Sequence, residues 1–182
     1  MELPNRNILL TGEVNEDTLA QIGNAILEIN NEDNKKSVAL KEYTREPIKI
    51  YINTPGGSVR DGFSIIDIID HSQTPVITIC LGKAYSMGLL ILLAGHVRFA
   101  SDNASSMMHD VSSGCFGKAE EIYEYAETLK NVQDQVFDYI KSKSKIPPKI
   151  MALARKGKQD VYFTQEEMIK HKIVDQKLDG LL

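Results

Sequence analysis

Residues 47–57, PIKIYINTPGG, contain the pattern that decides the fold class. Their first six residues alternate and are rich in β-branched isoleucine, which predicts a strand over 47–52. The segment 53–57 that follows is a strong turn signal, because proline and paired glycines favour tight turns. Apolar residues then recur at helical spacing from Asp61 to Ile69, so the stretch predicts a strand, a turn and a helix in succession.

The same succession recurs on both sides of this stretch. Before it, a short strand over 7–10 precedes a helix over 15–30. After it, a buried strand over 75–81 turns through residues 82–85 into an apolar helix that begins near Ser86. Strands that alternate with helices predict an α/β fold with largely parallel strand pairing.

The remaining segments complete this prediction. Polar residues 31–47 indicate a surface loop, and two further short strands are expected over 97–100 and 104–109. One long helix over 118–141 carries an apolar stripe, which packs either on the core or on a partner subunit. Pro148 fits the first turn of a shorter helix.

The composition is that of an ordinary globular protein. The 182 residues are 42% hydrophobic and 25% charged, and the net charge of −4 without a basic block argues against nucleic acid or an anionic membrane as the main partner. The N-terminus shows no secretory signal, and Cys80 and Cys115 are interpreted as free thiols in a reducing compartment, with no zinc pattern around them. We therefore expect a single cytoplasmic domain over residues 1–182, with no metal.

Two turns in the sequence are unusual enough to suggest chemistry. Ser86 lies between a buried strand and a helix N-terminus, whose free N–H groups and partial positive charge favour a developing oxyanion. A serine in this place is more often only a helix N-cap. The paired glycines of the 53–57 turn suggest an oxyanion hole built from the N–H groups of Gly57 and Met87, although a plain strand-to-helix turn would need the same residues.

A serine nucleophile needs a base near neutral pH, and the chain has four histidines. His71, His96 and His171 lie in polar or helix-end positions typical of surface or packing residues. His109 instead ends a predicted strand, where an α/β sheet places functional groups. Spacing does not select the carboxylate that would orient the histidine, because six aspartates compete: Asp102, Asp110, Asp134, Asp138, Asp160 and Asp175.

Taken together, these motifs resemble the proteolytic subunits of Clp protease over about residues 8–175. The matching segments, in order, are 50–57, 78–88, 93–95, 108–109, Asp160, 166–167 and 173–175. The resemblance implies a crotonase-like α/β spiral with a protruding handle helix over about 118–141. It also implies a homo-oligomer, a heptamer or two stacked heptamers that the handle joins around a chamber.

The resemblance further implies a serine endopeptidase that cleaves unfolded or delivered polypeptides. It selects a triad of Ser86, His109 and Asp160, an oxyanion hole from Gly57 and Met87, and no cofactor. The polypeptide substrate would lie as an added strand between two segments. The residues expected to bind it are Ser58, Val59, Ser112, Ser113 and Gly114.

The sequence also departs from the family pattern. Where the family usually has His-Gln-Pro, residues 109–111 are His-Asp-Val, and Gln159 stands where an arginine usually precedes the catalytic aspartate. Residues 35–47 look like an insertion. In the family, a segment before the first strand contacts the ATPase. Only a few residues precede Asn7 here, so the question of a Clp-type ATPase partner stays open. These changes suggest a divergent member, with a phage or prophage protein for capsid maturation as a hypothesis.

Three other functions compete with the endopeptidase. A signal-peptide-peptidase-like enzyme of the same fold would use a serine–lysine pair, for which Lys83 lies very close to Ser86 along the chain. A crotonase-fold enzyme acting on acyl-CoA thioesters would use the glycine turn without pairing serine and histidine. A structural or regulatory ring subunit would have lost catalysis.

Overall fold

Three long parallel strands form one side of the sheet in the computed structural model, which describes residues 5–156 and 159–180. They are β1 (Asn7–Val14), β2 (Ile48–Gly57) and β3 (Val76–Tyr85), and they pair in that order. Isoleucines at every second position of β2 are buried while the residues between them are not. One face of these strands therefore carries the core.

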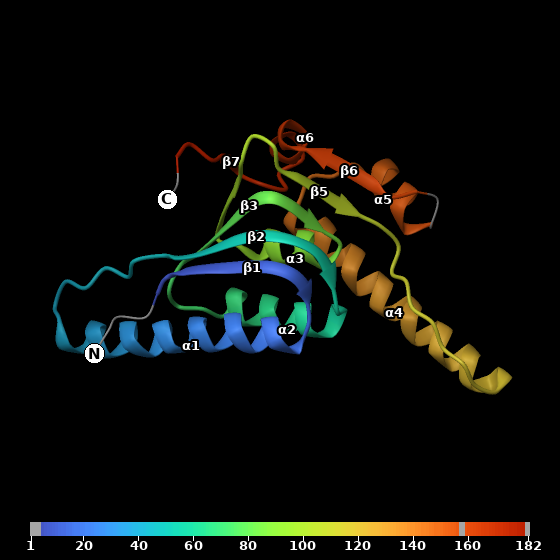
Figure 1. Ribbon diagram of the computed structural model, residues 1–182, viewed down its shortest axis with the longest axis horizontal. Helices are drawn as coiled ribbons and strands as arrows, with labels where there is room; N and C mark the ends of the chain where they lie inside the picture. The colour runs from blue at the N-terminus through green and yellow to red at the C-terminus, as the bar shows by residue number, and fades with distance from the viewer. Residues whose placement is uncertain (1–4, 157–158, 181–182) are drawn as a thin grey trace.

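Three helices cover that face, as Figure 1 shows. They are α1 (Glu16–Ala39), α2 (Val59–Asp70) and α3 (Met87–Ala94). All the residues of α3 are buried, because it contacts β2 and β3 on one side and α2 on the other. A helix that is apolar all round belongs inside a protein, and α3 occupies the centre of the core.

The strand β3 forks the sheet. Its first half pairs with β4, and its last residues pair with β5, which continues into an antiparallel pair with β6. The short strands are β4 (Val97–Ala100), β5 (Ser105–Met108), β6 (Val161–Thr164) and β7 (Gln176–Lys177). The fork brings the ends of β3 and β5 together, and these ends precede Ser86 and His109.

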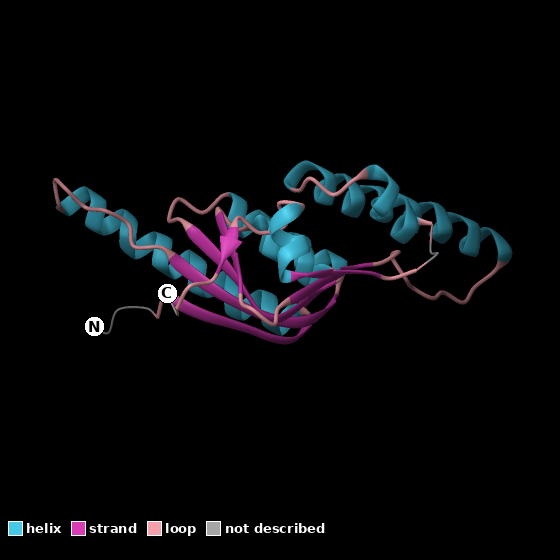
Figure 2. Ribbon diagram, turned by 90° about the horizontal axis from the view of Figure 1, so that it is seen from above, coloured by secondary structure: helices cyan, strands magenta, loops and turns pink. Residues whose placement is uncertain are grey.

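The long helix α4 (Ala119–Lys143) projects away from the sheet (Figures 1 and 2). Its buried residues Val136, Phe137 and Ile140 all lie in its second half, whereas Ile122 in its first half is exposed. The stripe predicted on this helix thus packs on the core at one end only.

Two short helices complete the chain, α5 (Pro148–Arg155) and α6 (Gln165–Lys170). Among the described residues, none of the helices combines the length and the apolar character that a membrane span requires.

The predicted order of strands and helices is confirmed as far as α5, but β6 and β7 were not predicted and three boundaries were wrong. The expected loop 31–47 is helical as far as Ala39. The expected turns at 53–57 and 82–85 are the ends of β2 and β3, which stay extended because each continues to pair with a neighbour. At these residues, pairing with neighbouring strands determines the backbone conformation more than the local turn-forming residues do.

A buried carboxylate ties together the starting ends of the three long strands. Asp33 in α1 has no exposed surface and accepts hydrogen bonds from Arg6 before β1, Tyr43 before β2 and Thr74 before β3. Burial by itself would raise the pKa of Asp33, but the bonds from Arg6, Thr74 and Tyr43 lower that pKa to about 2. The aspartate is therefore a charged anchor for all three strands.

Replacing Asp33 with asparagine should destabilise the fold. The folded pKa lies below the ordinary value of 3.8, so the charged group stabilises the fold above about pH 4, by about 2 kcal/mol, and that contribution disappears as the pH falls through 2. Urea unfolding of Asp33→Asn at pH 7 should show a loss of that order. Glu32→Gln, which removes the neighbouring surface ion pair with Lys35, is the matched control and should change little.

Candidate active site

Ser86 occupies a sharp turn between β3 and α3. Its backbone has φ 53° and ψ −121°, a conformation that side-chain-bearing residues rarely adopt. Such backbone strain costs roughly 1–3 kcal/mol and occurs mainly at functional sites. Ser86 also makes no side-chain cap to α3, so the role of a simple N-cap is not the one that the structure shows.

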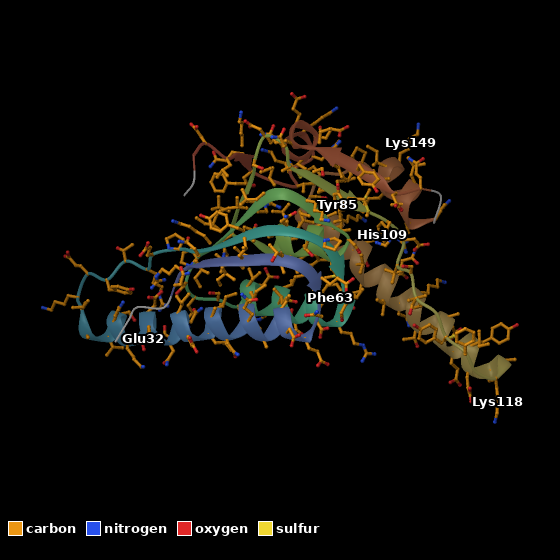
Figure 3. The ribbon with its side chains drawn as sticks, viewed as in Figure 1. Glu32, Phe63, Tyr85, His109, Lys118 and Lys149 are labelled. Carbon is orange, nitrogen blue, oxygen red and sulfur yellow. The ribbon has the colours of Figure 1, made fainter. Side chains whose placement is uncertain are left out.

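His109 lies against this serine. Its Nε2 is 2.9 Å from the Ser86 Oγ. The strand fork explains the contact, because Tyr85 pairs with Met107 and the Ser86 N–H donates to the Met107 carbonyl at 2.8 Å. Figure 3 labels Tyr85 and His109 near the end of the sheet from which α4 projects.

The glycine end of β2 packs directly on the serine turn. A Cβ on Gly56 would lie 2.7 Å from the Ser86 Cβ and 3.0 Å from the Met87 nitrogen, so no side chain fits there. Gly56 and Gly57 also have φ values of 98° and 151°, which side-chain-bearing residues rarely adopt. The two backbone groups expected to form an oxyanion hole, at Gly57 and Met87, thus come from segments in close contact.

A small cavity opens beside the serine and histidine. It has a volume of about 80 Å³, and its walls include the apolar side chains of Leu90, Val111, Val136 and Ile140. Since a water molecule needs roughly 10–15 Å³ of such space, the cavity can take a short side chain.

The residues expected to bind substrate are only partly gathered here. Val59 and Ser112 line the cavity. Ser58 instead caps α2 by accepting from the Asp61 N–H, and the Ser113 hydroxyl is hydrogen-bonded to Tyr125 in α4. Gly114 has no heavy atom within 4 Å of where a Cβ would stand.

Asp160 lies across the sheet from His109, because Met108 at the end of β5 pairs with Val161 at the start of β6. It is exposed in the segment before β6, and within residues 5–156 and 159–180 no hydrogen bond or ion pair joins it to His109. The structure therefore brings Asp160 near His109 without a bond between their side chains, and the role of Asp160 in the triad stays a prediction.

Three of the competing aspartates are engaged elsewhere. Asp102 pairs with Lys177, Asp134 with Arg155 and Asp175 with Arg98. Asp138 lies in a groove between α2 and α4. Asp110 contributes to the active-site cavity, and its buried Oδ1 has no partner among the described residues. Asp110 and Asp160 therefore stay the two candidates for the carboxylate that orients His109.

Sequence reasoning missed the close packing that supports the turn. A Cβ on Gly62 would lie 2.3 Å from the Met87 Cε, and a Cβ on Gly88 would lie 2.4 Å from the Thr54 Cγ2. Glycines inside helices are unfavourable and therefore usually have a packing reason. That signal at positions 62 and 88 was available in the sequence.

The Cys80 thiol is not a second nucleophile near neutral pH. Burial raises the pKa of the Cys80 thiol to about 11, so near neutral pH it is not a thiolate nucleophile. No group of three or more His, Cys, Asp or Glu side chains in the described part of the chain is arranged to hold a metal ion.

Comparison with known proteins shows which protein family this chain resembles. The family model described as Clp protease matches residues 2–179. An ATP-dependent Clp protease proteolytic subunit from Deinococcus radiodurans is 33% identical over 136 residues, which make up 74% of this chain and 66% of that protein. The chain thus spans just under two thirds of the relative's length. With a match along almost its whole length and a serine–histidine pair at the fork of its sheet, this chain belongs to the Clp protease family.

Proposed function

We propose that this protein is a serine endopeptidase in which Ser86 attacks peptide bonds and His109 acts as the base. The observation that carries the proposal is the 2.9 Å contact between His109 Nε2 and Ser86 Oγ on a strained turn. A nucleophile held within hydrogen-bond reach of a base is the arrangement that acyl transfer requires. Membership of the Clp protease family supports the same reaction.

The mechanism follows from this geometry. His109 takes the proton from Ser86 as the serine attacks the scissile carbonyl, and later gives it to the leaving amine before water releases the acyl group. The negative charge on the carbonyl oxygen would be held by the N–H groups of Gly57 and Met87.

The backbone of β2 supports Gly57 in that role. The Ser58 N–H donates to Val14 on β1, and the Gly56 N–H donates to a hydroxyl that is itself bonded to β1. Neighbouring N–H groups along an extended strand point to opposite edges, so we expect the Gly57 N–H to face the Ser86 turn. Met87 is the first residue of α3, where the N–H has no partner within the helix.

The substrate in this proposal is an unfolded or delivered polypeptide. It would lie extended between the end of β2, at residues 58–59, and the segment 112–114, with one side chain in the apolar cavity. A peptide added along backbone edges is recognised mainly by main-chain hydrogen bonds, which suits substrates of varied sequence.

We also propose that the site works inside a homo-oligomeric chamber of one or two heptameric rings. Ile122 and Tyr123 at the free end of α4 are exposed, and so is Phe116 in the segment leading to it. Large apolar side chains grouped on a projecting helix mark a protein interface. The Deinococcus relative is named as an ATP-dependent proteolytic subunit, and an ATPase partner for this chain stays an open part of the proposal.

A serine–lysine mechanism has less support. Lys83 lies in β3, where it is paired in register with Ser105, and no hydrogen bond joins it to Ser86 in the described chain. The acyl-CoA and non-catalytic alternatives do not need the serine–histidine contact that is present.

A fluorophosphonate should label Ser86 once per chain. Intact-mass measurement should show one adduct on the parent, none on Ser86→Ala, and strongly slowed labelling of His109→Ala, because an unactivated serine is a weak nucleophile. An unlabelled parent that binds coenzyme A would instead favour the acyl-CoA enzyme, and an unlabelled parent without a ligand would favour the non-catalytic subunit.

Asp160→Asn should lower kcat of peptide hydrolysis far more than KM. In serine proteases, loss of the carboxylate that orients the histidine lowers kcat by about 10⁴-fold. Asp110→Asn is the matched comparison, since it removes the charge of the carboxylate next to His109. A loss in Asp110→Asn that exceeds the loss in Asp160→Asn would transfer the orienting role to Asp110.

Ile122→Glu should weaken the proposed assembly without unfolding the subunit. The isoleucine is 43% exposed on the projecting part of α4, so a charge there costs little unless another copy covers it. Sedimentation velocity should show smaller particles than the parent gives. Val38→Glu places the same charge on an exposed apolar residue of α1, 89% accessible, and should leave the particle size unchanged.

A further inference from the structure

The hydrogen-bond ladder between β1 and β2 is interrupted beside the active site. Their register shifts between Thr11 and Glu13, where Gly12 has φ 80°. Beyond the shift the ladder resumes, with the Ser58 N–H donating to the Val14 carbonyl at 2.8 Å. At the shift itself, two backbone groups need partners that the opposite strand no longer provides directly.

The side chain of Thr54 fills this gap. Its Oγ1 donates to the Gly12 carbonyl at 2.5 Å and accepts from the Gly56 N–H at 3.1 Å. Thr54 has no exposed surface, so water does not compete for these bonds. A hydroxyl is suited to this position because it donates and accepts at the same atom.

The methyl group of the same residue touches the nucleophile helix. A Cβ on Gly88 would stand 2.4 Å from the Thr54 Cγ2, so the backbone of Gly88 rests directly on this methyl. Gly88 is the second residue of α3 and follows Met87. One threonine side chain therefore braces β2 through its hydroxyl and α3 through its methyl.

We propose that Thr54 is a positioning residue for the oxyanion hole, holding the Gly57 and Met87 N–H groups at the separation that one carbonyl oxygen requires. This inference rests on the proposed peptidase function. Gly56, which Thr54 holds, packs on the Ser86 turn and directly precedes Gly57. The hydroxyl fixes the first donor and the methyl fixes the second.

The expected effect of Thr54 substitutions on kcat follows from how precisely the donors of an oxyanion hole must be placed. Removing one oxyanion donor costs about 10²–10³-fold in kcat, and a 1 Å misplacement costs about 10²-fold. Thr54→Val keeps the shape but leaves the Gly12 carbonyl and Gly56 N–H without their partner. Thr54→Ser keeps both hydrogen bonds and loses only the methyl.

The test compares Thr54→Val, Thr54→Ser and a matched control, Thr78→Val. Thr78 is also fully buried and its hydroxyl donates to Leu92 at the other end of α3, at 2.7 Å, so its loss has a similar structural cost away from the site. Hydrolysis of a fluorogenic peptide gives kcat and KM, with active sites counted by exhaustive fluorophosphonate labelling. A peptide aldehyde reports on the hole itself, because its adduct with serine places an oxygen there.

For Thr54→Val we expect kcat per labelled site to fall about 100-fold with KM unchanged, and the aldehyde inhibition constant to rise by a similar factor. Thr54→Ser should lose less, about five- to tenfold, because it keeps the hydroxyl but not the methyl, and Thr78→Val should stay within about twofold because both Thr54 contacts are kept. Equal kcat in Thr54→Val and Thr78→Val would overturn the inference. A parent that shows no Ser86-dependent labelling or hydrolysis would overturn the proposed function instead.

A second pair of variants tests the methyl contact and does not depend on Thr54→Val folding. Gly88→Ala places a methyl against the Thr54 Cγ2 and should lower kcat by about tenfold or more, by displacing the Met87 N–H. Combining it with Thr54→Ser removes the colliding methyl and should restore most of the lost rate. If the double variant is no faster than Gly88→Ala, Thr54 does not set the position of α3.

Discussion

The close approach of Gly56 to the Ser86 turn is the constraint on which the site depends. With only hydrogen on the Gly56 Cα, the end of β2 can lie against the Ser86 Cβ and the Met87 nitrogen. Any side chain would push β2 from α3 and separate the two backbone segments that flank the nucleophile. The paired glycines are thus needed for proximity as well as for their backbone angles.

The forked strand β3 supplies the other half of the arrangement. Because β3 pairs with β4 early and with β5 late, β5 ends beside the Ser86 turn and delivers His109 to the hydroxyl. The Ser86–His109 pair is therefore positioned by strand pairing, while the opposite ends of the three long strands are held by Asp33. Figure 3 shows the distance between these regions, with Glu32 and His109 labelled far apart along the molecule.

Much of this arrangement was predictable because it depends on local patterns. Alternating isoleucines gave β2, helical spacing gave α1 and α2, and the apolar stretch after Ser86 gave α3. Residues 53–57 and 82–85 were misjudged because turn-forming residues there are held extended by partner strands, which no local pattern reveals. The Asp33 cluster and the Thr54 brace were not foreseen, since each joins segments far apart in the sequence. The choice of Asp160 as the partner of His109 came from resemblance alone, and the pairing of β5 with β6 places the two residues near each other without a bond between their side chains.

The backbone of Ser86 has a consequence for how the sequence can change over time. A left-handed φ of 53° strains every residue except glycine, so Ser86 occupies a position where glycine would make the fold more stable. Selection for stability alone would replace Ser86 with glycine and abolish the hydroxyl in one step. A serine kept on this strained backbone is what the proposed nucleophilic role requires, so the conformation supports a catalytic use of the fold over a purely structural one.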